Sequence, residues 1–293
     1  MGLLDGRVAV VTGGGGGLGE AYAKLFANEG AAVLVNDLGP SRDGIGADGS
    51  SAERVANEIR SHGGRAVANG DDVSTLAGGE NILEDALHHF GQVDILVNNA
   101  GILRDRSFAN TVEADWDTVI KVHLKGAYCV TLPVWRWMKE AGRGGVIVLT
   151  ASTSGMFGNF GQANYAAAKA GVYGLMRVLE IEGVRYGIRV WGLAPSAYTR
   201  LTADLVQEPD PASLPENIAP TVLYMVSDLS SPHTGRMLGA SGRSVREIRV
   251  VQAKGYKPQK GWSAGDLATH LDQVFLSGEP DSALSASTSP GHG

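Results

Sequence analysis

Tyr165 and Lys169 stand four residues apart in the helical stretch NYAAAKAG, so one helix face is expected to carry both side chains. An ammonium group beside a phenol favours the phenolate and is expected to lower the tyrosine pKa towards the working pH. A phenolate can act as the general base that takes the proton of an alcohol while its hydride leaves. The pair therefore indicates hydride transfer, with Lys169 also able to bond a nicotinamide ribose. The alternative is a tyrosine that only packs, because this spacing is frequent by chance.

Ser152 lies 13 residues before Tyr165, directly after a predicted strand. In α/β folds the carboxyl ends of the strands are where ligands bind. A hydroxyl at such a place can hold the substrate oxygen and stabilise developing alkoxide charge. Ser154 competes for this role, and a loop serine is often only solvated. We assign catalysis to Ser152, Tyr165 and Lys169, with substrate contact by Ser152 and Tyr165.

A glycine-rich turn, TGGGGGLG from Thr12 to Gly19, follows the first predicted strand and precedes a helix. Backbone N–H groups and the positive helix N-terminus can face a pyrophosphate there, because glycines lack the Cβ atoms that would hold it away. A flexible linker is the alternative, but the position between strand and helix favours phosphate binding by Gly13, Gly17 and Gly19.

Asp37 ends the second predicted strand, about 20 residues after the glycine turn, where an acid accepts hydrogen bonds from the adenosine ribose. The same carboxylate would repel a 2′-phosphate, so NAD is the predicted cofactor. Two alternatives stay open at this point. In the first, Asp37 only caps a loop. In the second, the nearby Arg42 offsets the repulsion between Asp37 and a 2′-phosphate, so that NADP can bind.

Two further strand ends carry residues suited to a nucleotide. Asp72 and Val73 follow the third predicted strand, where the carboxylate can accept from the adenine amino group while the valine packs on the ring. Asn99, Ala100 and Gly101 follow the fourth, and their small size lets a ribose lie against the sheet edge. A turn aspartate is common, so Asp72 alone is a weak indication.

Short β-branched runs alternate with helical patterns along the chain. Strands are predicted at 7–12, 32–37, 65–69, 93–97, 145–150 and 188–193, and helices near 18–29, 51–62, 76–90, 113–141 and 162–186. This alternation predicts an α/β fold with a doubly wound parallel sheet of the Rossmann type. We expect one dinucleotide-binding and catalytic domain over 1–242, a C-terminal extension over 243–279 packed on it, and a disordered tail over 280–293.

Composition excludes several classes of function. The 293 residues are 43% hydrophobic and 19% charged, as in globular proteins. The net charge is −6, so the basic surface expected of a nucleic-acid-binding protein is not indicated. The single cysteine, Cys129, excludes a disulfide framework, and no His/Asp/Glu cluster has metal-ligand spacing, so no metal is predicted. No run of 18 apolar residues occurs, so no membrane partner is expected. With no signal-like segment in MGLLDGRVAVVTGG, we expect a cytoplasmic protein.

The motifs TGGGGGLG, NNAG and Ser152…Tyr165-x-x-x-Lys169, in this order and spacing, resemble the short-chain dehydrogenase/reductase family over about residues 5–240. The resemblance implies that Ser152, Tyr165 and Lys169 are the catalytic residues of an oxidoreductase with a small-molecule substrate. It also implies that the helix within 127–141 pairs with a second subunit, so a homodimer or homotetramer is expected.

Further segments resemble one branch of that family, the (3R)-hydroxyacyl-CoA dehydrogenase unit of peroxisomal multifunctional enzymes of type 2, or D-bifunctional proteins. They include NDLG at 36–39, NNAGILRDRSF at 98–108 and ASTSGMFGNFGQANYAAAK at 151–169. The branch implies NAD and oxidation of 3-hydroxyacyl-CoA to 3-ketoacyl-CoA. By position, it implies cofactor contacts from Leu18, Asp37, Asp72, Val73, Asn99, Ala197, Thr199 and Arg200.

His123 departs from the wider family, which usually carries asparagine there, whereas its context VHLKG matches the branch. A role in a water-linked proton path from Lys169 and a purely structural helix histidine are equally compatible with the sequence. Tyr198 replaces a small residue expected in the branch, which changes the expected pocket shape. Two other functions remain open, an NADPH-dependent carbonyl reductase for ketoacyl or steroid-like substrates and a non-catalytic nucleotide-binding regulator.

Overall fold

The structure is a computed structural model that describes residues 2–39, 49–198 and 210–276. The predictions made for Arg42, Thr199, Arg200 and the tail 280–293 lie outside these residues. The chain divides into two compact units, Met1–Glu247 and Ile248–Gly293. The site described below belongs to the first unit.

The first unit is built on an eight-stranded sheet in the order β3-β2-β1-β4-β5-β6-β7-β8, counted over the described residues. The strands are β1 Val8–Thr12, β2 Ala32–Asn36, β3 Arg65–Asn69, β4 Ile95–Asn98, β5 Gly145–Thr150, β6 Ile188–Ser196, β7 Arg236–Ser241 and β8 Ser244–Ile248. The pairs from β3 through β7 are all parallel. The two-residue connection between β7 and β8 makes that pair an antiparallel hairpin. The predicted doubly wound α/β fold is therefore confirmed.

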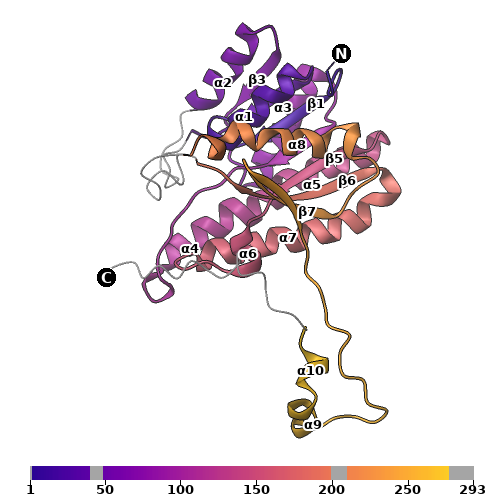
Figure 1. The fold of residues 1–293 in the computed structure, drawn as a ribbon. Helices are drawn as coiled ribbons and strands as arrows, with labels where there is room; N and C mark the ends of the chain where they lie inside the picture. Colours follow the sequence, from indigo (N-terminus) through magenta and orange to yellow (C-terminus); the bar gives the residue numbers. More distant parts are fainter. Residues whose placement is uncertain (1, 40–48, 199–209, 277–293) are drawn as a thin grey trace. The chain divides into compact units, whose positions relative to one another are not determined.

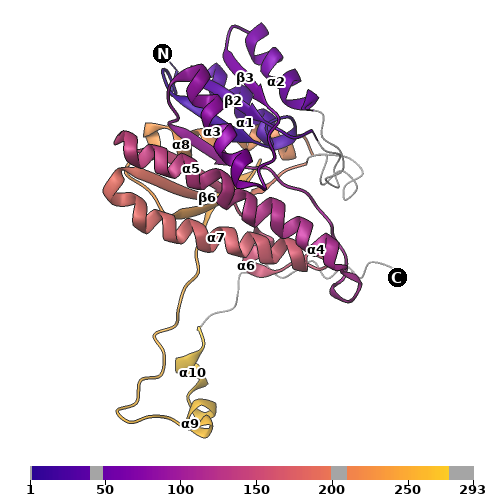
Figure 2. The ribbon, with the colours of Figure 1, turned by 180° about the vertical axis from the view of Figure 1, so that it is seen from behind.

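Helices cover both faces of this sheet. Their bounds are α1 Gly17–Asn28, α2 Ser50–Ser61, α3 Leu76–Phe90, α4 Glu113–Ile120, α5 Gly126–Ala141, α6 Thr153–Phe157, α7 Ala163–Gly183 and α8 Ala219–Val226. Helices α1 and α8 pack together and lie over one face, as Figure 1 shows. Helices α3, α5 and α7 lie over the opposite face, seen from behind in Figure 2.

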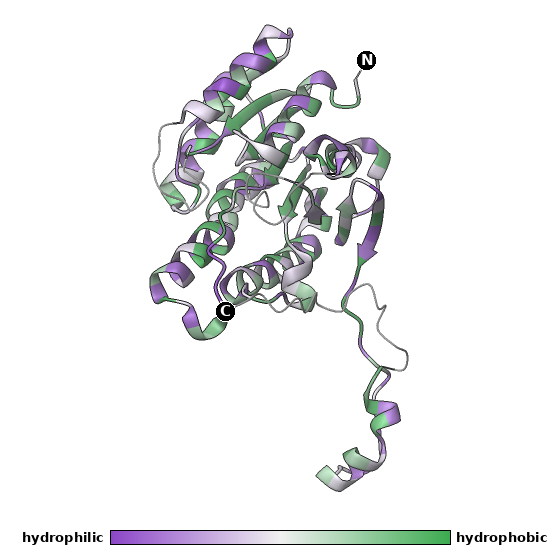
Figure 3. Ribbon diagram, turned by 60° about the vertical axis from the view of Figure 1, so that its left-hand side comes forward, coloured by the Kyte–Doolittle hydropathy of each residue, from purple (hydrophilic) through white to green (hydrophobic). Residues whose placement is uncertain are grey.

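The core lies between the sheet and these helices. Every residue of β1 and β2 is buried, which explains why their sequences are continuous apolar runs rather than alternating ones. Trp191, Tyr22 and Phe26 are its largest fully buried side chains. Figure 3 shows the same pattern, with hydrophobic residues following the central strands. Burial of this apolar surface holds the strand ends, and thus the site, in fixed places.

The helix predicted over 113–141 is divided in the structure. A π-helical segment, Lys121–Lys125, separates α4 from α5. Such a bulge adds a single residue to one turn of an otherwise helical pattern, and the apolar spacing alone did not reveal it. It carries His123, whose side chain is turned into the site.

The strands β1 and β4 are neighbours although they are not consecutive, so the chain reverses its winding direction between them. In open α/β sheets this switch point leaves a crevice at the carboxyl ends of the strands, where ligands bind. The glycine turn follows β1 and NNAG begins in β4, so both reach this crevice.

The described part of the second unit contains two short helices, α9 Ala264–Thr269 and α10 Leu271–Val274. Ser263 and Asp266 form a capping box at the start of α9, and the rings of Tyr256 and His270 stack with centroids 4.2 Å apart. Packing of 243–279 on the catalytic domain stays a prediction. Across the described ranges, no helix has both the length and the apolar character needed to cross a membrane.

Candidate active site

Tyr165 and Lys169 both belong to α7, and the structure places them against each other as their spacing predicts. The Nζ atom of Lys169 lies 5.5 Å from the centroid of the Tyr165 ring. Lys169 is only 3% exposed, and its Nζ donates a hydrogen bond of 2.5 Å to the carbonyl oxygen of Thr150 at the end of β5. The sheet edge therefore fixes the amine at the base of the site.

Burial governs the charges of this pair. Burial lowers the pKa of the Lys169 ammonium to about 7. Burial raises the pKa of the Tyr165 phenol; the Ser152 hydrogen bond acts to lower that pKa, and the Asp105 carboxylate raises it. The expectation that Tyr165 has a lowered pKa is therefore wrong for the protein alone. Desolvation of the phenolate outweighs the favourable hydrogen bond from Ser152.

Ser152 immediately precedes α6, and its side chain is oriented by the first turn of that helix. Its Oγ accepts a 3.1 Å hydrogen bond from the backbone N–H of Ser154 and bonds the Tyr165 hydroxyl. The competing Ser154 hydroxyl is directed elsewhere, since it donates to Oε1 of Gln162 at 2.8 Å. The geometry thus brings Ser152, rather than Ser154, to the tyrosine.

A set of polar contacts ties the loop after β4 to the start of α7. Gln162 donates to Asp105 at 2.7 Å, and Asn164 donates to the carbonyl oxygen of Arg104 at 3.1 Å. The buried carboxylate of Asp115 pairs with Arg104 at 3.1 Å and with Arg106 at 3.0 Å. These residues were not among the sequence-derived candidates. They fix the loop after β4 against the start of α7, the helix that carries Tyr165 and Lys169.

His123 of the π-helical segment is buried against the same ring. Its imidazole lies edge-on to the Tyr165 ring, with centroids 5.1 Å apart and planes at 88°. Its Nε2 lies 2.7 Å from the carbonyl oxygen of Ile102 and 3.1 Å from the backbone N of the same residue, and the shorter contact favours Nε2–H as the donor. Burial, and then the nearby Lys169 charge, lowers the pKa of His123 to about 3. A neutral ring that donates through Nε2 leaves Nδ1 as a hydrogen-bond acceptor.

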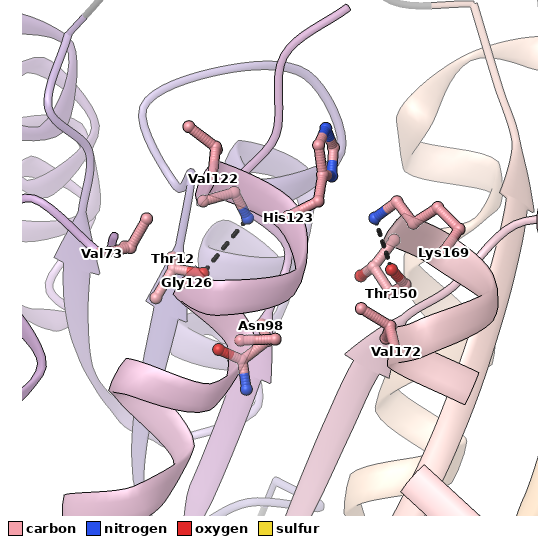
Figure 4. A pocket seen from close by; sticks show the side chains of 11 residues that line it. Thr12, Val73, Asn98, Val122, His123, Gly126, Thr150, Lys169 and Val172 are labelled. Atoms are coloured by element: carbon pink, nitrogen blue, oxygen red, sulfur yellow. Dashed lines mark hydrogen bonds between the residues drawn. The ribbon is translucent and has the colours of Figure 1, made fainter. Parts of the chain in front are cut away.

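A small cavity of about 10 Å³ is lined by His123 and Lys169, whose side chains are drawn in Figure 4. This is about the space of one water molecule. The Nδ1 atom of His123 and the Oγ1 atom of Thr150 are buried and have no hydrogen-bond partner among the described residues. Both side chains line the cavity. His123 is therefore not a fully satisfied structural histidine.

A larger cavity of about 510 Å³ opens along the carboxyl ends of the strands. This volume lies in the range that holds small-molecule ligands and cofactors. Its lining includes the predicted positions Gly13, Gly17, Leu18, Asp37, Asp72, Val73, Asn99, Ala100, Gly101, His123, Tyr165, Lys169 and Ala197. Among the other predicted positions, Ser152 adjoins it through its bond to Tyr165. Thr199 and Arg200 lie outside the described residues.

The glycine turn fits the close approach of a phosphate. Gly13 adopts a φ of +64°, and a Cβ there would lie 2.8 Å from the Cα of Ala100. Gly19 sits behind the turn, where a Cβ would lie 2.1 Å from the carbonyl oxygen of Gly13. Asn99 donates to the carbonyl oxygens of Thr12 and Gly13 at 3.1 and 3.3 Å, which joins the β1 turn to the end of β4. The turn is thus a fixed cradle rather than a flexible linker.

Asp37 lies at the other end of the cavity with its carboxylate facing the turn. Its Oδ2 accepts from the N–H of Gly15 at 2.9 Å and its Oδ1 from the N–H of Gly39 at 2.8 Å. Asp72 accepts from the N–H of Ser74 at 2.8 Å and so orders the turn after β3. The cavity, its glycine cradle and this acid fit a dinucleotide, with Asp37 at the adenosine end and Tyr165 at the reacting end.

Residues 7–210 match the family described as short chain dehydrogenase, so the chain belongs to the short-chain dehydrogenase/reductase family. Members of this family bind NAD or NADP and catalyse hydride transfer, and this chain is an oxidoreductase of that class. Within the part of the chain that the structure describes, no group of three or more potential metal ligands occurs.

The chain is similar to several known proteins. It is 48% identical over 233 residues to the peroxisomal multifunctional enzyme type 2 of Mus musculus, covering 79% of this chain and 31% of that protein. It is 34% identical over 304 residues to hydroxyacyl-CoA dehydrogenase ChsB1 of Mycobacterium tuberculosis, covering 97% and 93%. A short chain dehydrogenase from Mycobacterium avium matches with a TM-score of 0.82 and 38% identity, covering 94% and 98%. The chain thus spans about a third of the multifunctional enzyme.

Proposed function

We propose that this protein oxidises a 3-hydroxyacyl-CoA thioester to the 3-ketoacyl-CoA with NAD as the hydride acceptor. The observation that carries the proposal is the convergence of Ser152, Tyr165 and Lys169 at one end of a cavity whose other end presents Asp37. The likeness to the multifunctional enzyme and to a hydroxyacyl-CoA dehydrogenase supports the substrate class. This would place the protein in lipid metabolism.

The bound nicotinamide ring supplies the hydride acceptor, and the chain's own residues handle the proton. The substrate C–H bond breaks, and its electron pair leaves with the hydrogen as hydride. The O–H proton passes to the Oη of deprotonated Tyr165, and a C=O bond forms. Ser152 accepts from the Ser154 N–H, and its own hydroxyl bonds Tyr165; a substrate oxygen bound beside them would take up that hydroxyl hydrogen. Because the pKa of Tyr165 is raised by burial, the Lys169 ammonium is needed to favour its phenolate, and a bound oxidised nicotinamide would add positive charge beside it.

We assign His123 a supporting role in the same reaction. Its neutral imidazole packs edge-on against the Tyr165 ring and holds it in place. Its Nδ1 and the Thr150 hydroxyl face the small cavity beside Lys169, which suits a water-linked proton path away from the amine. The histidine thereby serves as a positioning residue for the tyrosine and as an acceptor for the path.

Asp37 favours NAD over NADP in this proposal, because its carboxylate would repel a 2′-phosphate. One observation favours the second candidate, an NADPH-dependent carbonyl reductase: Arg54 of α2 lines the same end of the cavity. A fluorescence titration with NADH and NADPH separates the two. Tighter binding of NADPH would overturn the NAD proposal and favour the reductase.

The substrate class is tested with a panel of 3-hydroxyacyl-CoA esters, steroid alcohols and sugar alcohols, read by the absorbance of NADH. We expect kcat/KM to be highest for a 3-hydroxyacyl-CoA of R configuration. Equal or better turnover of a steroid or sugar alcohol would refute the assignment. If the protein turns over no substrate of the panel but binds the nucleotide, the alternative of a non-catalytic nucleotide-binding regulator would be favoured.

We further propose a homodimer or homotetramer located in the cytoplasm. Support for self-association comes from Val178 and Ile181 on the outer face of α7 and from Val184 directly after it, which are 52%, 70% and 67% exposed. Apolar side chains gathered on one face are typical of interfaces. Sedimentation equilibrium measures the subunit number, and a monomer at micromolar concentration would contradict the proposal.

A further inference from the structure

Both terminal nitrogens of the Arg54 guanidinium group, on α2, are hydrogen-bonded where the side chain lines the cavity. Its Nη1 donates to Oε1 of Glu20 at 3.0 Å, and its Nη2 donates to Oε2 of Glu20 at 2.6 Å. The same Nη2 donates to the carbonyl oxygen of Gly15 at 2.9 Å. Glu20, in the first turn of α1, thus grips both terminal nitrogens of the arginine in a bidentate pair.

The arginine and Asp37 meet at a single glycine. The N–H of Gly15 donates to Asp37, while the carbonyl oxygen of Gly15 accepts from Arg54. A Cβ at Gly15 would lie 2.4 Å from the Oγ of Ser51 and 2.8 Å from Oδ2 of Asp37. The Ser51 Oγ is buried and has no hydrogen-bond partner within the described part of the chain. An acid, a hydroxyl and a guanidinium group therefore crowd around the adenosine end of the cavity.

The acid and the guanidinium group favour different nucleotides. A carboxylate there accepts from the ribose hydroxyls of NAD, whereas a nearby arginine accommodates the 2′-phosphate of NADP. The planar guanidinium binds phosphate through its paired N–H donors, which are the same donors that bind a carboxylate. The choice of cofactor therefore depends on whether the Arg54 donors are available as well as on Asp37.

The local charges keep the Glu20 carboxylate ionised and in place. Burial raises the pKa of Glu20, but the contacts with Arg54 and Lys24 outweigh it and the pKa is lowered. Lys24 holds Glu20 at 2.7 Å from the following turn of α1. A phosphate would have to displace this carboxylate, which is bonded to both Arg54 and Lys24, to gain the paired Nη donors of the arginine.

We propose that Glu20 is a specificity-determining residue for the cofactor: by occupying the Arg54 guanidinium it withholds that cation from a 2′-phosphate and reinforces the NAD selectivity set by Asp37. The inference rests on the proposed NAD function and adds a second residue to it. Glu20 acts through Arg54, so it is a positioning residue. The ligand class that it excludes is a nucleotide bearing a ribose 2′-phosphate.

The test measures NADPH and NADH affinities by fluorescence titration, without turnover, in an Asp37→Ser background that lacks the repelling acid. Adding Glu20→Gln is expected to strengthen NADPH binding about tenfold relative to NADH, because a charge-assisted pair with the phosphate becomes available. Adding Arg54→Gln to this double variant is expected to abolish the gain. The NADH titration of each sample also reports the fraction of folded, binding-competent protein.

Glu58→Gln is the matched control, since it removes an equal charge from the same network. Glu58 contacts Arg54 only at 3.5 Å and pairs mainly with Lys24 at 2.6 Å. It is expected to change the ratio of the two affinities less than twofold. An equal gain from Glu58→Gln, no gain from Glu20→Gln, or a gain that survives Arg54→Gln would each overturn the inference. Failure of the NAD proposal is distinct, because it appears as tighter NADPH binding by the unmutated protein.

Discussion

Gly101→Ala is a precise probe of the contact between the loop after β4 and His123. The added Cβ would lie 2.4 Å from Cε1 of His123, which is less than a real Cβ contact allows. The imidazole is buried and tied to Ile102 at 2.7 Å, so it has little room to retreat. Overpacking of this kind costs about 1–3 kcal/mol, and we expect a loss of about 2 kcal/mol in the free energy of unfolding.

The same substitution is expected to lower kcat. A displaced imidazole no longer supports the Tyr165 ring that it contacts at 5.1 Å between centroids. We expect a fall of about tenfold, since a misplaced catalytic group loses the benefit of orientation. Urea denaturation measures the stability, and the absorbance of NADH measures kcat with the best substrate of the panel.

Gly174→Ala is the matched control within α7. A Cβ there meets nothing within 4 Å among the described residues, so the substitution is expected to stabilise the helix by about 0.5–1 kcal/mol. A double-mutant cycle locates the cause: with His123→Ala present, the cost of Gly101→Ala should largely disappear. If the two costs simply add, the steric reasoning is refuted.

Two more predictions concern the reacting groups. Ser152→Ala removes the hydroxyl bonded to Tyr165 and is expected to lower kcat by about 10²–10³, whereas Ser154→Ala, whose hydroxyl bonds Gln162, should lower it less than tenfold; equal losses would reject the assignment. The pKa of Lys169 is lowered by burial from 10.5 to about 7, so between these values the unfolded chain binds a proton that the folded chain lacks. The free energy of unfolding, relative to Lys169→Met, should therefore rise from pH 7 to pH 9 in urea titrations, and a flat or falling difference would contradict the assignment.

Much of the fold is readable in the sequence because buried parallel strands have a simple signature. The runs at 32–37 and 145–150 are apolar on both faces, and the structure places β2 and β5 there. The π-helical segment was not readable, because its effect on the spacing of apolar residues is a single inserted position. The strands β7 and β8 were not predicted, since RMLGAS and SVREI mix small, polar and apolar residues.

Part of the site could be predicted from the sequence, because some of its residues are close neighbours along the chain. Tyr165 and Lys169 are near neighbours on one helix, so sequence spacing alone brings them together. Asp105 bonds Gln162 from 57 residues away and Glu20 bonds Arg54 from 34 residues away, and no periodicity encodes such pairs. The direction of the Tyr165 pKa also depends on how deeply the whole fold buries the phenol, which the four-residue spacing to Lys169 does not specify.

The role of Tyr165 as the group that takes the substrate proton is tested most directly by Tyr165→Phe, assayed for kcat and, on the same sample, for NADH binding by fluorescence. The variant keeps the ring that packs against His123 and removes only the hydroxyl. Loss of a general base predicts a fall in kcat of about 10³ or more, with NADH affinity within about threefold of the parent. A kcat within tenfold of the parent would contradict the mechanism.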